Sequence, residues 1–100
     1  MNKQKITNLL GLAQRAGKII SGEEMVVKAI QDQKVKLVFL AHDAAPNLTK
    51  KIQDKSHYYQ VEVITVFSTL ELSIAVGKIK EKVLAVTDAG FTKKMRSLME

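Results

Sequence analysis

Lysine side chains dominate the chemistry that this sequence offers, and groups suited to catalysis are few. The chain has no cysteine and only two histidines, His42 and His57, which fall in different segments without a close acidic partner. No zinc-ligand spacing is present, and no serine stands in the Gly-x-Ser-x-Gly turn of a hydrolase nucleophile. The sequence therefore predicts no catalytic residue and no metal site.

Glu23 and Glu24 are adjacent carboxylates, which raises the question of acid–base chemistry. Neighbouring residues on a helix point in different directions, so we interpret the pair as a complement to the positive end of a helix dipole. Gly11, Gly17 and Gly22 are too widely spaced for a dinucleotide-binding turn, and no nucleotide-binding P-loop is present. An enzyme is the interpretation with the least support, and no cofactor is expected.

Positive charge marks the composition, with 16 lysine and arginine residues against 10 aspartate and glutamate residues, a net charge of +6. Fourteen of the 16 cations are lysines, whose ammonium groups suit phosphate contacts that do not need the planar guanidinium group of arginine. Because cations that neutralise phosphates release condensed counterions, this balance favours a polyanionic partner. The same composition also fits a basic domain without such a partner.

The length of 100 residues and the 46% hydrophobic content suit one packed core, so we expect a single domain over residues 1–100. The apolar runs are too short to cross a bilayer, and the N-terminus lacks the uninterrupted apolar segment of a secretion signal. The absence of cysteine suits a reducing compartment. We therefore expect a cytoplasmic monomer that does not enter a membrane.

The chain alternates between helical and extended hydrophobic periods with short connections. Asn47 is predicted to cap one helix, and Ser68 and Glu71 have the capping-box spacing at the start of another. The pattern predicts helices over residues 3–16, 23–32, 47–58, 68–76 and 90–99, and strands over residues 18–21, 35–41, 61–66 and 83–87. Such alternation predicts an α/β fold with a mixed or parallel sheet between helical layers.

Four short segments, in their order and spacing, resemble a known family. They are residues 17–22 with 28–30, residues 34–38, residues 41–47 and residues 71–78. Together they resemble the kink-turn RNA-binding ribosomal proteins of the L-seven-Ae and L-thirty-e types, and among these the short bacterial members called the YlxQ type. The resemblance covers essentially the entire chain. It implies a three-layer α/β/α sandwich with a four-stranded mixed sheet, and a non-catalytic protein that binds ribosomal or other structured RNA.

The resemblance implies two RNA-binding segments. In such proteins the start of the second helix, here residues 22–28, enters the groove of a kink-turn, a sharply bent RNA with tandem sheared G·A pairs. The loop before the last strand, here residues 77–83, covers an extruded nucleotide. A helix N-terminus attracts phosphate, and bent RNA offers base edges that a regular A-form groove hides. The predicted RNA-binding residues are Lys18, Gly22, Glu23, Glu24, Met25, Lys28, Lys78, Ile79, Lys80 and Lys82.

Each of these residues also has a purely structural interpretation. Lys28 matches the family's lysine directed at a guanine edge, and it could equally be a solvated surface cation. Gly22 would let the backbone approach RNA closely, and it could equally serve as a left-handed residue before a helix. Ile79 and Val83 would supply apolar contacts beside the lysines of the loop, although Val83 could simply begin the strand.

Three further lysines, Lys18, Lys34 and Lys36, would extend a basic rim if they lay on the side of these segments. Lys18 ranks first because it adjoins the start of the second helix in sequence. The assignment to RNA requires that the start of the second helix and the loop before the last strand share one basic surface.

Two positions depart from the family pattern. Relatives place asparagine or lysine where Glu24 stands, and glutamate, glutamine or serine where Met25 stands. Glu24 accepts hydrogen bonds but repels phosphates, and Met25 makes no charged contact. An alternative is therefore a protein-interaction module on the same scaffold, with Met25, Val26 and Val27 as an adaptable apolar surface.

Overall fold

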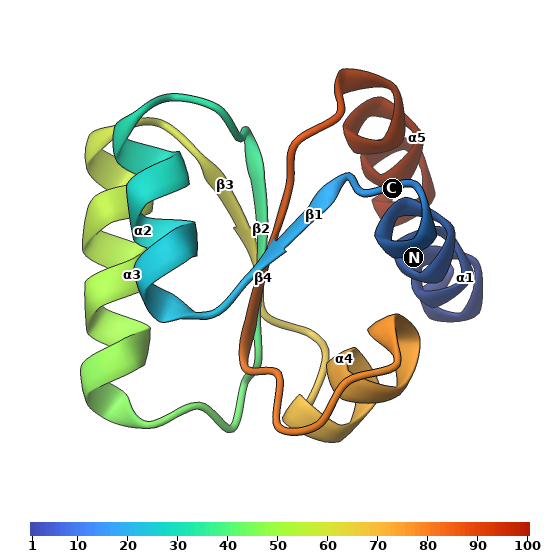
Figure 1. Cartoon of the computed structure of the whole chain (residues 1–100), viewed down its shortest axis with the longest axis horizontal. Helices are drawn as coiled ribbons and strands as arrows, with labels where there is room; N and C mark the ends of the chain where they lie inside the picture. Colours follow the sequence, from blue (N-terminus) through green and yellow to red (C-terminus); the bar gives the residue numbers. More distant parts are fainter.

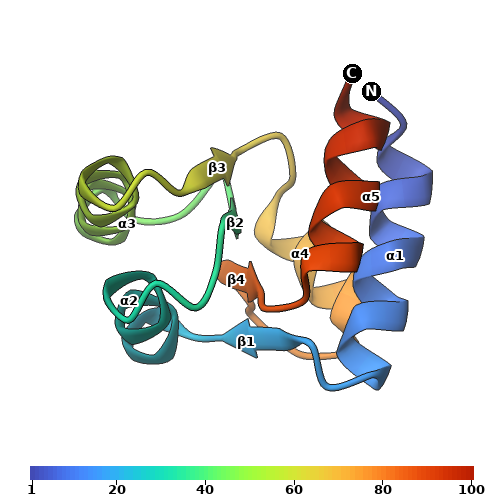
Figure 2. The same ribbon diagram turned by 90° about the horizontal axis from the view of Figure 1, so that it is seen from above.

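The computed structural model describes all residues from 1 to 100 as a four-stranded sheet between two layers of helices (Figure 1). The elements are α1 (Lys3–Arg15), β1 (Ile19–Ser21), α2 (Glu23–Gln31), β2 (Leu37–Leu40), α3 (Pro46–Tyr58), β3 (Glu62–Ile64), α4 (Thr69–Val76), β4 (Val83–Val86) and α5 (Ala89–Met99). Helices α2 and α3 cover one face of the sheet, and α1, α4 and α5 cover the other (Figure 2). The predicted three-layer α/β/α sandwich is confirmed.

The sheet is mixed and has the strand order β1-β4-β2-β3. Strand β4 pairs antiparallel with both β1 and β2, whereas β2 and β3 are parallel. All residues of the central strands β2 and β4 are buried, as expected for strands covered on both faces. This order places β4 next to β1, so the loop that precedes β4 lies beside the end of β1.

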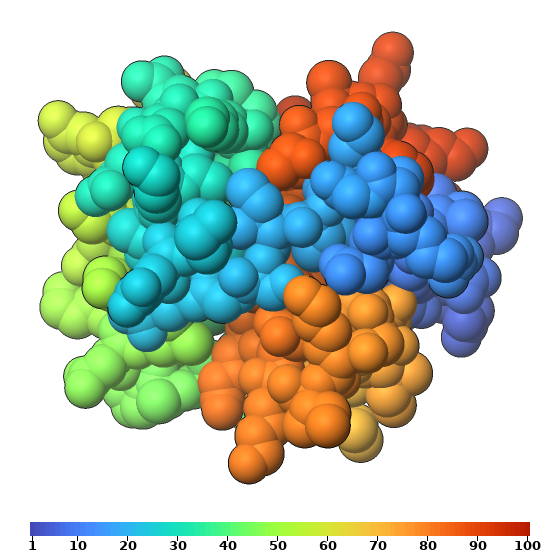
Figure 3. Space-filling view, in the orientation of Figure 1, coloured from blue at the N-terminus to red at the C-terminus, as the bar shows by residue number.

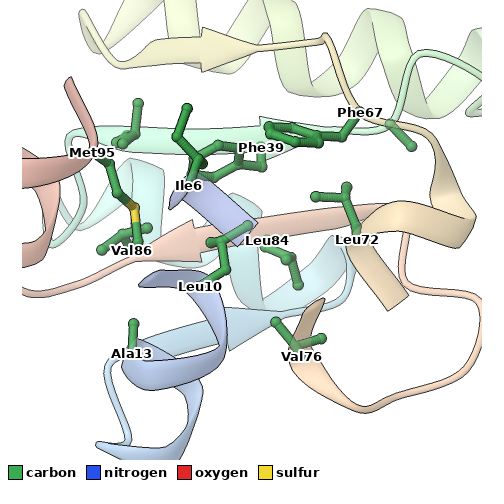
Figure 4. Packing of buried hydrophobic residues seen from close by; sticks show 12 residues of the cluster. Ile6, Leu10, Ala13, Phe39, Phe67, Leu72, Val76, Leu84, Val86 and Met95 are labelled. Carbon is green, nitrogen blue, oxygen red and sulfur yellow. The ribbon is translucent and has the colours of Figure 1, made fainter. Parts of the chain in front are cut away.

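Side chains of the central strands alternate between two hydrophobic cores. Leu37 and Phe39 point to the core under α1, α4 and α5, while Val38 and Leu40 point to the core under α2 and α3. Figure 4 shows the first core, in which the ring centroids of Phe39 and Phe67 lie 5.9 Å apart. The two cores fix the sheet rigidly between its helical layers.

The prediction of a capping box before α4 is confirmed. The Ser68 hydroxyl accepts a hydrogen bond from the Glu71 amide at 3.1 Å, and the Glu71 carboxylate accepts one from the Ser68 amide at 2.9 Å. The hydrogen bond from the Ser68 amide, together with Lys3, holds the pKa of Glu71 below its usual value. No helix of the structure is both long and apolar enough to cross a membrane.

Two details of the predicted elements are wrong. Asn47 does not cap α3, because that helix begins at Pro46 after Ala45, and proline suits the first helical position, where an amide proton has no partner. Strands β2 and β3 are also shorter than the predicted ranges 35–41 and 61–66, because β2 pairs with β4 over four residues and β3 pairs with β2 over three.

Candidate nucleic-acid interface

Antiparallel pairing of β1 with β4 brings the two predicted RNA-binding segments together. Ser21 pairs with Leu84, so Gly22 at the start of α2 lies beside Val83 at the end of the loop, and the Gly22 amide donates to the Val83 carbonyl at 3.3 Å. The Lys78 ammonium donates to the Ser21 hydroxyl at 3.1 Å. In Figure 3 the residues of the loop before β4 (orange) adjoin those of β1 and the start of α2 (blue to cyan). The two segments therefore share one surface.

The loop over residues 77–82 is held in place by a serine of α4. The Ser73 hydroxyl accepts a hydrogen bond from the Glu81 amide at 2.8 Å and donates one to the Thr69 carbonyl at 2.7 Å. The Ser73 carbonyl accepts a bond from the Lys78 amide at 2.9 Å. These bonds fix the base of the loop, while Lys78, Ile79 and Lys80 remain exposed at its tip.

Gly22 connects β1 to α2 in a backbone conformation that favours glycine. Its φ of 92° and ψ of 148° lie outside the regions open to other residues, and no side chain caps the first turn of α2. The first amide groups of α2 are therefore left open toward the shared surface. An uncapped helix N-terminus of this kind suits phosphate.

The Gly22→Ala variant is expected to lose about 1–3 kcal/mol of its free energy of unfolding, because alanine is strained at this φ and ψ. No heavy atom lies within 4 Å of an added Cβ, so the loss would come from the backbone and not from a clash. Urea denaturation measures it. Gln53→Ala is the control, since Gln53 is exposed in the middle of α3, where alanine is favourable. Equal losses in both variants would contradict this account of Gly22.

Charges at the start of α2 are only partly compensated. Glu23 pairs with Lys51 of α3 at 3.0 Å, which directs its charge away from the loop, while Glu24 is exposed and makes no ion pair. Lys28 lies 3.6 Å from Asp32 in an exposed pair, which contributes little and leaves the ammonium accessible. Glu24 and Lys28 stand one helical turn apart and so share a face of α2.

The apolar residues of the two segments divide into exposed and buried side chains. Met25 is 57% exposed and Ile79 is 84% exposed, so both are free to make contacts. Val26 and Val27 are buried in the core under α2, and Val83 is buried as the first residue of β4. The expectation that Val26 and Val27 offer an apolar surface is wrong, and Val83 supplies no surface contact.

The three lysines of the predicted rim lie at the other end of the sheet. The Lys18 carbonyl accepts a hydrogen bond from the Thr87 amide at 3.0 Å, which places Lys18 beside the C-terminal end of β4. Lys34 and Lys36, which precede β2, line a groove with residues of α5 at that same end. Lys18 therefore lies beside the groove, next to Thr87 of its lining, and all three lysines are separate from the start of α2.

The turn that precedes α3 has a structural role in this fold. The Asp43 carboxylate accepts hydrogen bonds from the Thr69 hydroxyl at 2.7 Å and from the Thr69 amide at 2.9 Å. These two bonds hold the pKa of Asp43 below its usual value. The structure brings no three histidine, cysteine, aspartate or glutamate residues together in a way that could hold a metal ion.

Sequence reasoning missed two features of these surfaces. One is Ser73, whose role as anchor of the loop has no local sequence signal because its partner, Glu81, lies eight residues away. The other is the part that α5 plays in the basic groove, to which Lys93 and Arg96 contribute. Helical periodicity places residues three apart, such as Lys93 and Arg96, on one face of a helix, but it does not show which residues lie opposite that face.

Comparison with protein families and curated proteins gives consistent results. Residues 4–96 match the model of the "Ribosomal protein L7Ae/L30e/S12e/Gadd45 family". The chain is 48% identical over 99 residues to the RNA-binding protein YlxQ of Enterococcus faecium, covering 99% of this chain and 95% of that protein. It is 47% identical over 92 residues to the RNA-binding protein YlxQ of Bacillus subtilis (strain 168), covering 92% of each.

Two solved structures have the same architecture. A protein of unknown function from Bacillus halodurans superimposes with a TM-score of 0.90 at 44% identity, covering 95% of this chain and 96% of that one. The 15.5kD RNA binding protein of Giardia lamblia superimposes with a TM-score of 0.84 at 17% identity, covering 95% of this chain and 82% of that one. The likeness to the Giardia protein is one of fold.

Proposed function

The chain belongs to the L7Ae/L30e/S12e/Gadd45 family of ribosomal proteins, and on this premise we propose that it is a non-catalytic RNA-binding protein. The proposed RNA is structured and sharply bent, of the kink-turn kind, and it binds at the start of α2 and the loop over residues 77–82. The relatives from Enterococcus faecium and Bacillus subtilis carry the name of RNA-binding proteins, which supports this assignment. The cytoplasm and the ribosome are the proposed setting.

The contact between the two segments is the observation that carries the proposal. The Lys78–Ser21 and Gly22–Val83 hydrogen bonds hold the loop against the start of α2. One surface therefore combines the open amide groups of a helix N-terminus with the exposed lysines of a loop. Regular duplex RNA presents few base edges, so a bent element suits such a composite surface better.

Individual residues have distinct proposed roles on this surface. Lys28 would reach a base edge or a phosphate from the exposed face of α2, and Lys78 and Lys80 would contact the backbone of the adjacent strand. Ile79 would pack against an unstacked base, because its side chain is 84% exposed and free to make this contact. Glu24 would accept a hydrogen bond from an exocyclic amine, which is the contact that its charge allows.

Binding to a panel of three RNAs tests the proposal. We expect the protein to bind a bent RNA with tandem G·A pairs more tightly than a duplex or a single strand of equal length. We expect Lys28→Ala to lower the affinity for the bent RNA about 10-fold and to reduce the slope of log K against log salt by about 0.9, the value for one phosphate contact. If none of the three RNAs bound at low salt, the proposal would fail.

A protein-interaction module remains the second candidate, because Met25 and Ile79 expose apolar surface at adjacent segments. Burial of Val26 and Val27 leaves this surface small. The two functions differ in their salt dependence, since an apolar contact persists at high salt whereas phosphate contacts weaken. A protein complex that survives nuclease and high salt would favour the second candidate.

A further inference from the structure

A groove of about 670 Å³ opens at the end of the sheet that lies away from the start of α2. The segment before β2, the end of β4 and one face of α5 form its walls. In Figure 3 the residues that follow α2 (teal) and those near the start of α5 (orange-red) stand on either side of the upper edge of the molecule. This groove is not part of the surface to which RNA binding is assigned above.

Four cations line the groove, and few acids balance them. Lys34 and Lys36 come from the segment before β2, and Lys93 and Arg96 come from α5, while Glu100 is the one acidic residue of the lining. No carboxylate lies within salt-bridge distance of Lys34, Lys36 or Lys93, and all three are exposed. Like charges gathered in one groove repel each other, and a bound anion would relieve this repulsion.

Arg96 fixes the walls of the groove relative to one another. Its Nε donates to the Glu62 carboxylate at 2.8 Å, and its terminal nitrogen donates to the Lys36 carbonyl at 3.2 Å. These bonds join α5 to β3 and to the segment before β2. The backbone segments that carry the three unpaired lysines are therefore held together, while the charge of Arg96 is paired with that of Glu62.

A short distance separates the groove from the surface at the start of α2. Val83 lies beside Gly22, and Val86, at the other end of the same strand, lines the groove. Three residue steps along a strand span about 10 Å, which is about a third of one turn of a nucleic-acid duplex. Lys18, whose carbonyl accepts a hydrogen bond from the Thr87 amide, lies at the groove end of this path. One RNA could therefore cover both surfaces.

We propose that this groove is a second phosphate-binding surface, which holds the backbone of the RNA segment that flanks the element bound at the start of α2. This inference rests on the proposed function and adds a second region of contact to it. Lys34, Lys36 and Lys93 bind phosphates there, and Lys18, which lies next to Thr87 of the lining, adds a fourth positive charge at the rim of the groove. The groove binds without reading sequence, because lysines act on phosphates as point charges.

The same phosphate chemistry could come from a free phosphorylated molecule. The lining favours the RNA backbone, since Val86 and Ala89 are its only hydrophobic residues and no aromatic ring is present to stack on a base. Sites for small molecules usually enclose most of the ligand, whereas the lysines of this groove are exposed to solvent. Pyrophosphate serves as the probe for a small anion.

The test compares two variants of equal net charge. The groove variant is K34Q/K36Q/K93Q, and the distal control variant is K5Q/K55Q/K94Q, whose lysines make no ion pair and lie outside both the groove and the surface at α2. Each is titrated with a short bent RNA and with the same RNA extended by about ten base pairs, one duplex turn.

At about 0.1 M salt we expect the groove variant to bind the extended RNA about 100-fold more weakly than the wild type, against less than about 5-fold for the distal control variant. For the short RNA, the two variants should agree within about 2-fold. For the extended RNA the salt slope of the groove variant should fall by about 2–3 units, the value for three phosphate contacts. Equal affinities of the two variants for the extended RNA would overturn the inference alone. The wild type could instead bind pyrophosphate tightly and the groove variant lose this binding, while the affinity of the groove variant for RNA is unchanged. This result would overturn the inference and show that the groove binds a small anion. Failure of the wild type to bind either RNA would overturn the proposed function and this inference together.

Discussion

A K28Q/K78Q/K80Q variant is expected to bind the short bent RNA about 100-fold more weakly than the wild type at about 0.1 M salt. The three lysines come from α2 and from the loop before β4, and they are exposed on or beside the shared surface. Each phosphate contact contributes about 0.9 to the slope of log K against log salt, so three contacts account for a loss of this size. Electrophoretic mobility shift or fluorescence anisotropy measures the affinity over a series of salt concentrations.

The distal control variant K5Q/K55Q/K94Q separates local contacts from net charge. It also loses three positive charges, but none of them lies on the shared surface. Its affinity for the short RNA should therefore fall by less than about 5-fold, because only the general electrostatic attraction is reduced. Circular dichroism should show both variants and the wild type folded, because the substituted lysines are exposed or, at Lys55, half-buried, and lie outside the two cores. Comparable losses in the two variants would mean that the protein binds RNA through its overall charge and has no defined interface.

Most of the fold could be predicted because its central elements carry strong local signals. The continuous apolar runs at β2 and β4 indicate strands covered on both faces, and both are fully buried. The reciprocal hydrogen bonds of Ser68 and Glu71 follow directly from their spacing. The prediction failed at the start of α3, where two local signals compete. Asn47 is a good helix cap, but the helix begins one residue earlier, with Pro46 at the first helical position.

The candidate site could be predicted in its segments but not in its geometry. The family resemblance indicated the start of α2 and the loop before β4, and strand pairing brings them together at Gly22 and Val83. Lys18 was expected near the start of α2 because it is close to Gly22 in sequence. This expectation is wrong, because β1 separates the two residues and a strand advances about 3.3 Å per residue. Lys18 consequently stands beside Thr87, at the other end of β4.

The basic groove lay beyond the reach of sequence reasoning for a different reason. Lys36 and Arg96 are 60 positions apart, and the bond from the Arg96 guanidinium to the Lys36 carbonyl depends on how α5 crosses the sheet. Helical periodicity shows which residues of α5 share a face, but it does not show which strand end that face meets. Contacts between distant segments of this kind come only from the tertiary structure.

The Phe39→Ala variant is expected to lose about 3–5 kcal/mol of its free energy of unfolding. Phe39 is fully buried in the middle of β2 and packs against Phe67 in the core shown in Figure 4. Alanine would remove the transfer free energy of the ring and leave a cavity between the sheet and the helices on that face, of which α5 is tied to β3 by Arg96. For a domain of this size the total free energy of unfolding is about 5–15 kcal/mol, so this one ring accounts for a large part of it.

Thermal and urea denaturation would measure this loss, with Leu70→Ala as the control. Leu70 is 68% exposed in α4 and belongs to neither core, so its truncation should change the free energy of unfolding by no more than about 0.5 kcal/mol. The midpoint of thermal unfolding should fall by about 12–40 °C for Phe39→Ala, because each kcal/mol corresponds to about 4–8 °C in a domain of this size. A loss below about 1.5 kcal/mol for Phe39→Ala would mean that the helices of this face move to close the cavity, and that the frame presenting both basic surfaces is less rigid than its packing indicates.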